Sequence, residues 1–177
     1  MIRRLIFLLA FSSLALLGIY GASSANAQTV VLTDTEINLI KENCHSVKNT
    51  LNQLHASDAL LRVNRGQVYE ALLVRMIEPF NSRLGNNRLD NRATSTIAAN
   101  YKSALDTFRT DYRLYEQKLS DAMRIDCVAE PATFHRLLQE ARENRKQVNT
   151  SVQKLHRVVN DYRSAVEDFL INYKDRV

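Results

Sequence analysis

Residues 131–173 read PATFHRLLQEARENRKQVNTSVQKLHRVVNDYRSAVEDFLINY, and this stretch decides the fold. Apolar residues recur in it at alternating spacings of four and three, which is the repeat of a helix that packs against other helices. Arg145 is the one polar residue on this stripe, and Pro131 suits the first turn of a helix, where a missing N–H costs nothing. The stripe consists of Phe134, Leu138, Ala141, Arg145, Val148, Val152, Leu155, Val159, Tyr162, Val166, Phe169 and Tyr173.

Two more helical segments precede this one. The first begins at Thr33, which can cap the helix while Glu36 reaches back to it. Its stripe continues past a kink expected at Pro79 and ends at the residues Gly85-Asn86-Asn87, which tolerate left-handed backbone. The stripe of the first segment is Ile37, Ile40, Cys44, Val47, Leu51, Leu54, Leu61, Val68, Leu72, Met76, Phe80 and Leu84, with Asp58 and Arg65 as polar exceptions. The second segment carries Ile97, Tyr101, Leu105, Phe108, Tyr112, Tyr115, Leu119 and Ala122.

These patterns predict an all-α protein with helices at about 34–84, 90–126 and 131–175. Because short connections make consecutive helices antiparallel, we expect an elongated up-down-up three-helix antiparallel coiled-coil bundle. Residues 28–177 would form this single domain, as a monomer or a homodimer.

The first 27 residues have the layout of a secretory signal peptide. Arg3 and Arg4 form a basic head, an apolar run follows, and Ala25-Asn26-Ala27 offers small residues for cleavage. The alternative is an uncleaved membrane anchor, since an apolar run of about 18 residues is close to the length that spans a bilayer. Either reading places the rest of the chain outside the cytoplasm, and the pattern favours a bacterial source.

Composition excludes several classes of protein. Removing residues 1–27, which carry two arginines and no acidic residue, lowers the net charge from +5 to +3, and the remaining charges are interspersed. That balance is not the footprint of a nucleic-acid-binding protein. Beyond the leader only Gly66 and Gly85 are glycine, so neither a sheet with tight turns nor a glycine-rich phosphate loop is expected.

The two turns of the chain predict which residues meet. A turn at Gly85-Asn86 brings together positions whose residue numbers add up to about 171, as those of Cys44 and Cys127 do. Outside the cytoplasm two cysteines at one height form a disulfide, with an intermolecular bond as the alternative. A zinc site that adds His45 and His135 is disfavoured, because adjacent residues such as Cys44 and His45 point about 100° apart on a helix.

The second turn sets the first and third helices parallel with an offset of 87 residues. This offset places Asp58 beside Arg145, with Tyr112 of the second helix at the same level, and predicts a buried contact that fixes helix alignment. Arg65 comes level with Asp106. The alternative interpretation of these charges is a polar notch that binds an anionic ligand.

No pattern of residues indicates catalysis, a cofactor or a metal. The sequence Glu42-Asn43-Cys44-His45 contains a single Glu-x-x-His, whereas di-metal bundles need two copies and further carboxylates. We therefore expect a non-enzymatic extracytoplasmic scaffold or interaction protein of the cell envelope, with protein partners and with membrane contact only if the leader is retained. The alternatives are a helical ligand-binding or sensor module at Asp58 and Arg145, and a periplasmic chaperone-like holder.

Overall fold

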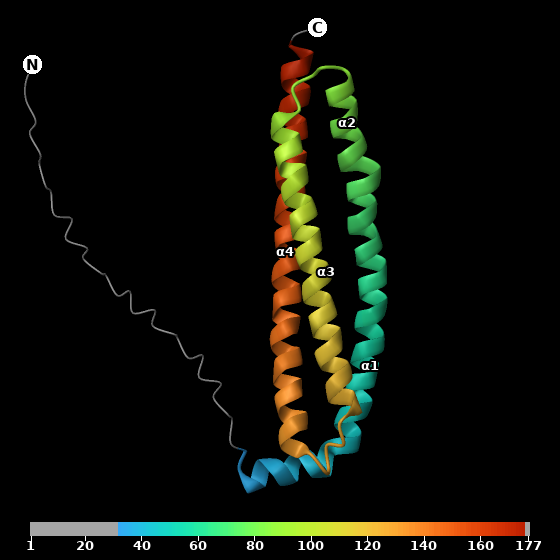
Figure 1. Ribbon diagram of the computed structural model, residues 1–177, viewed down its shortest axis with the longest axis vertical. Helices are drawn as coiled ribbons and strands as arrows, with labels where there is room; N and C mark the ends of the chain where they lie inside the picture. The colour runs from blue at the N-terminus through green and yellow to red at the C-terminus, as the bar shows by residue number, and fades with distance from the viewer. Residues whose placement is uncertain (1–31, 176–177) are drawn as a thin grey trace, which may run out of the picture. The chain divides into compact units, whose positions relative to one another are not determined.

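The protein is all-α in the part that the structure, a computed structural model, describes, which is residues 32–175. Three helical arms are joined by two short connections, and no strand occurs in these residues (Figure 1). The expected signal or anchor segment, 1–27, lies outside the described residues. The first arm consists of α1 (Asp34–Leu72), the π-helix η1 (Leu73–Ile77) and α2 (Glu78–Asn86), the second is α3 (Arg92–Arg124), and the third is α4 (Pro131–Lys174). Within residues 32–175, no helix has a stretch apolar enough and long enough to cross a membrane.

The predicted capping box begins the first arm. Thr33 Oγ1 accepts a hydrogen bond from the Glu36 N–H at 3.3 Å, and the Thr33 N–H donates to Glu36 Oε2 at 2.8 Å. The two residues thus satisfy each other's otherwise unpaired donors at the helix start. The α4 helix begins with Pro131 in its first turn, as the sequence predicted.

The π-helix η1 lies immediately before Pro79. The Glu78 N–H donates to the Leu73 carbonyl, one residue further back than in an α-helix. Since Pro79 has no N–H to continue the regular ladder, the wider turn forms at this point. The extra residue also rotates the apolar face, so that Ile77 is buried while Met76 of the predicted stripe is exposed.

The first arm ends at the predicted residues, since α2 stops at Asn86, but the left-handed residue is a different one. Left-handed backbone occurs at Arg88, with φ of 54°, and not at Gly85, Asn86 or Asn87. Just beyond α2, the N–H groups of Arg88 and Leu89 donate back to the carbonyls of Gly85 and Leu84, at 3.0 and 2.9 Å, and close the helix end.

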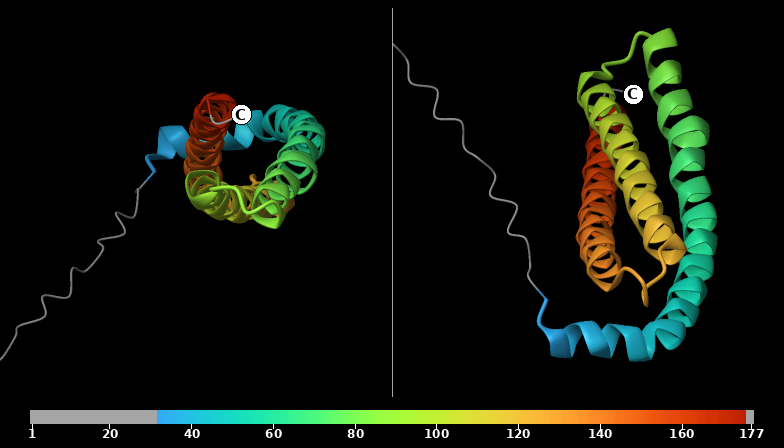
Figure 2. Two further views of the ribbon diagram at one scale, coloured as in Figure 1. Left: turned by 90° about the horizontal axis from the view of Figure 1, so that it is seen from above. Right: turned by 60° about the horizontal axis from the view of Figure 1, so that its bottom comes forward.

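The core is formed mainly by α3 and α4, which make the most extensive contact in the described chain. One side of α3 is buried along its length, whereas α1 buries only Tyr69 fully. The beginning of α1 turns across the end of the α3–α4 pair, and the rest of the first arm runs beside the pair (Figures 1 and 2). The buried residues of α3 are Thr94, Tyr101, Ala104, Leu105, Phe108, Tyr112, Tyr115, Leu119 and Ala122.

The stripe predicted for α1 is wrong at Leu61 and Val68, which are 50% and 62% exposed. Tyr69 takes the inward position instead, because its ring packs edge-on against Phe108 at 5.5 Å and its hydroxyl lies 3.1 Å from His156 Nε2. A large ring with partners on both neighbouring helices fills this level of the core, and it turns the smaller Val68 outward.

Candidate functional site

Cys44 and Cys127 join the start of α1 to the connection between α3 and α4. Their Cα atoms are 5.7 Å apart and the two residues form a disulfide, so the predicted pairing is confirmed. Cys127 is fully buried. Within residues 32–175, which include His45 and His135, no group of three or more His, Cys, Asp or Glu side chains is arranged to hold a metal ion.

Asp58 receives hydrogen bonds from two other helices. Arg145 Nη2 of α4 donates to its Oδ1 at 3.2 Å, and the Tyr115 hydroxyl of α3 donates to its Oδ2 at 2.5 Å. The side chain of Asp58 is 12% exposed and that of Arg145 is 53% exposed. The structure therefore brings the two predicted residues together but leaves the arginine in solvent, contrary to the expectation of a buried pair, because its long side chain reaches Asp58 from the edge of the helix interface.

Tyr115, predicted only as part of the core stripe, is the α3 residue bonded to Asp58. Burial raises the pKa of Tyr115, and the bond to Asp58 raises the pKa further, so the hydroxyl stays protonated as a donor. Tyr112 has another partner, the Arg62 guanidinium, which lies 4.9 Å from its ring centroid. The register of the first turn puts position 113 opposite Asp58, so Tyr112 and Tyr115 both lie near the level of Asp58. Which of the two bonds to Asp58 is decided by the direction of each side chain.

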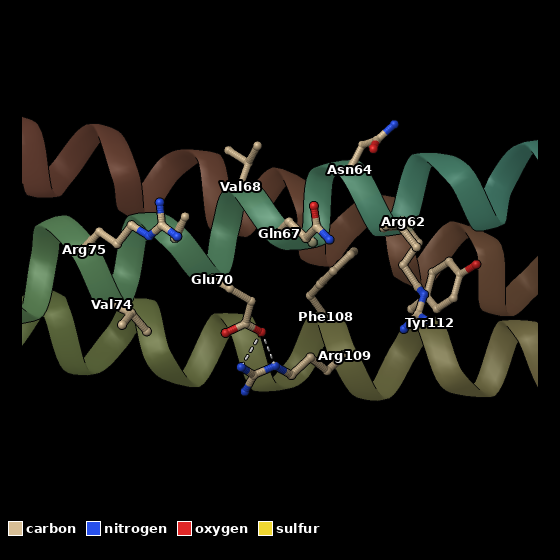
Figure 3. A pocket seen from close by; sticks show the side chains of 13 residues that line it. Arg62, Asn64, Gln67, Val68, Glu70, Val74, Arg75, Phe108, Arg109 and Tyr112 are labelled. Atoms are coloured by element: carbon tan, nitrogen blue, oxygen red, sulfur yellow. Dashed lines mark hydrogen bonds and ion pairs between the residues drawn. The ribbon is translucent and has the colours of Figure 1, made fainter.

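Arg65 and Asp106 are not paired. Asp106 accepts a hydrogen bond from Arg109, three residues along the same helix, and Arg109 Nε also donates to Glu70 of α1 at 2.7 Å (Figure 3). A partner one turn away on the same helix surface is closer than one on the opposite helix. Arg65 is exposed and lies at the edge of a cavity instead.

This cavity, which we call the notch cavity, has a volume of about 250 Å³ between α1, α3 and α4. Three arginines and one aspartate line it, so the charged groups of its lining carry a formal charge of +2. Its other walls are aromatic and aliphatic, apart from the amide of Asn149. The lining residues are Asp58, Leu61, Arg62, Arg65, Tyr69, Phe108, Tyr112, Tyr115, Arg145, Val148, Asn149 and Val152.

A broader recess of about 960 Å³ lies along α1 where it faces α3, and we call it the α1 recess. Arg62, Phe108 and Tyr112 line both hollows, and Figure 3 shows Arg62 beside the Tyr112 ring with the Glu70–Arg109 pair further along. Apolar side chains of α1 and η1 line the recess, among them Val63, Val68 and Val74.

The α1 and η1 segments expose an unusual number of large apolar side chains. Six of them, between residues 60 and 76, are 45–67% exposed. Leu60, Val63 and Val74 are spaced by three and eleven residues, which places them on one side of the helix. The six residues are Leu60, Leu61, Val63, Val68, Val74 and Met76.

In comparisons with known proteins, no family model, no curated protein and no solved structure matched this chain.

Proposed function

We propose that this protein is a non-enzymatic, extracytoplasmic helical scaffold or interaction protein of the cell envelope, and that the α1 recess is where a protein partner docks. The observation that carries the proposal is that three of the exposed apolar side chains of α1 and η1, Val63, Val68 and Val74, line this recess. Single exposed apolar residues are ordinary, but several of them that line one recess are typical of an interaction surface.

The partner we infer is an amphipathic helix with acidic residues beside its apolar side. Arg62 and Arg75 line the recess without an acidic partner among the described residues, whereas Arg109 is already paired with Glu70. A recess lined by valines and aromatic rings together with unneutralised arginines favours an apolar helix face flanked by carboxylates.

The compartment and the finer architecture are parts of the same proposal. The disulfide supports an oxidising compartment, which agrees with a cleaved signal at residues 1–27 in a bacterial envelope protein. Two short connections at which the chain reverses support an up-down-up antiparallel coiled-coil bundle as monomer or homodimer (Figure 1).

A photo-crosslinking amino acid at Val63, introduced into the full-length chain in cells, tests the docking surface. We expect one protein partner to be captured from outside the cytoplasm at this position, and much less of it when the probe replaces the exposed Thr107 of α3. Adding Val74→Glu should abolish capture, because a buried carboxylate would face acidic flanks, while Thr107→Glu should have no effect. Equal capture from both probe positions would refute the docking surface, and recovery of a cytoplasmic chain with an intact Met1 would refute the compartment.

A chaperone-like holder of unfolded clients is the second candidate, favoured by the same exposed apolar residues. A holder should suppress aggregation of unrelated denatured proteins at equimolar amounts, and Val63→Glu together with Val74→Glu should remove that suppression. A scaffold with one partner should leave the aggregation of those proteins unchanged.

A further inference from the structure

The notch cavity combines apolar walls with arginines that lack acidic partners. Arg145 is bonded to Asp58, but Arg62 lies over the Tyr112 ring, and Arg65 makes no ion pair with any of the described residues. A guanidinium stacked on a ring keeps its charge and its N–H donors for another group. Arg62 and Arg65, which have no acidic partner among the described residues, therefore attract an anion.

The rest of the cavity suits an apolar group. Phe108, Val148 and Val152 line it, and the Asp58 carboxylate on one side is held by Tyr115 and Arg145. An anionic group would be repelled by Asp58 and drawn to Arg62 and Arg65, which lie about one and two turns further along α1. The apolar body of the same molecule would then lie against the aliphatic and aromatic walls.

The volume limits the size of this body. An apolar cavity of roughly 150 Å³ holds one benzene ring. The notch cavity, at about 250 Å³, has room for one ring with a short acidic chain and not for a long acyl chain.

We propose that the notch cavity binds a small aryl carboxylate, with its carboxylate at Arg62 and Arg65 and its ring between α1, α3 and α4. Guanidinium groups match carboxylates with two parallel hydrogen bonds, which gives the site its preference for this anion. The bound ligand would touch all three arms and would hold α1 against the α3–α4 pair. This ligand site goes beyond the docking function proposed for the α1 recess.

The test uses the oxidised chain from residue 28 onward and three probes: 3-phenylpropionate, its neutral amide 3-phenylpropionamide, and inorganic phosphate. Binding is followed by chemical shifts of the cavity residues and by the thermal unfolding midpoint. We expect 3-phenylpropionate to bind at one site and to raise the midpoint. The amide and phosphate should each bind at least about tenfold more weakly, since one lacks the charge and the other the ring.

Two kinds of variant locate the site. Arg65→Gln and Arg62→Gln should each weaken 3-phenylpropionate at least about tenfold, whereas Arg113→Gln, at an exposed arginine of α3 outside the cavity lining, should not. Val152→Phe fills the cavity without changing charge and should block binding, and circular dichroism checks that each variant is folded.

Three results would overturn the proposal. Equal affinity for the amide would show that the arginines do not select the ligand, and equal affinity for phosphate would show a general anion site. Unchanged binding in folded Arg62→Gln, Arg65→Gln and Val152→Phe variants, or no binding of 3-phenylpropionate at millimolar concentrations, would rule out the cavity as its site.

Discussion

Reduction of the disulfide should weaken the protein substantially, and most of all in α1. The bond joins residues 83 positions apart in the sequence. The chain-entropy relation for a loop of this length gives about 4.5 kcal/mol, and measured values for single disulfides are about 2–4 kcal/mol. We therefore expect the free energy of unfolding to fall by about 2–4 kcal/mol when the bond is reduced.

The loss should be uneven along the chain. Tyr69 is the only residue of α1 that is buried, so the first half of this helix has little core to hold it without the bond to Cys127. Segments with few buried contacts open locally at low free energy. Amide exchange should therefore increase first at residues 34–50, and α3 and α4 should keep more of their protection.

Guanidinium unfolding with and without dithiothreitol measures the global loss, and hydrogen exchange with mass spectrometry measures the local one. The Cys44→Ala, Cys127→Ala double variant is the control, since dithiothreitol should not change its stability further. Equal free energies of unfolding for the oxidised and reduced wild type would refute the reasoning, as would exchange that increases uniformly over all three arms.

Three more changes test the remaining interactions. Asp58→Ala leaves the Tyr115 hydroxyl without its acceptor, so we expect the free energy of unfolding in chemical denaturation to fall by about 1–3 kcal/mol. Asp58→Asn should reduce it less. A fall below about 0.5 kcal/mol in Asp58→Ala would contradict the contact. Burial raises the pKa of Tyr101 to about 12. The contribution of Tyr101 to the free energy of unfolding should therefore be fully present below about pH 10, where this tyrosine begins to ionise in the unfolded chain, and should fall by up to about 2 kcal/mol towards pH 12. Tyr101→Phe should remove that part of the alkaline loss, and an identical pH profile in this variant would refute the assignment. Gly66 lies inside α1 with nothing within 4 Å of an added Cβ, so Gly66→Ala should stabilise the protein by about 0.5–1 kcal/mol in the same assay, whereas destabilisation would show crowding there.

Which residues of α1 face inward could not be predicted from the sequence alone. A stripe through Leu61 and Val68 has the correct period, yet Tyr69 is the residue that packs inward. The period of a helix follows from its backbone geometry, but its rotation depends on side-chain volumes contributed by the two helices beside it. The Phe108 ring and His156, both distant in sequence, decide this rotation.

The candidate site divides in the same way. The turn positions were sufficient to bring together Cys44 with Cys127 and Asp58 with Arg145, because a turn sets the height at which residues on neighbouring helices meet. The level at which residues meet does not specify the direction of their side chains, so it could not show that Tyr115 and not Tyr112 bonds to Asp58.

By itself, the amino-acid sequence determined that the chain is helical, where the capping box and Pro131 begin helices, and which residues share a level, since these follow from local propensity and chain reversal. Only the tertiary structure decided how far each residue is buried. It left Arg145 in solvent and opened the notch cavity between the three arms, because burial depends on how closely α1 approaches the α3–α4 pair, and that distance is a property of all three helices packed together.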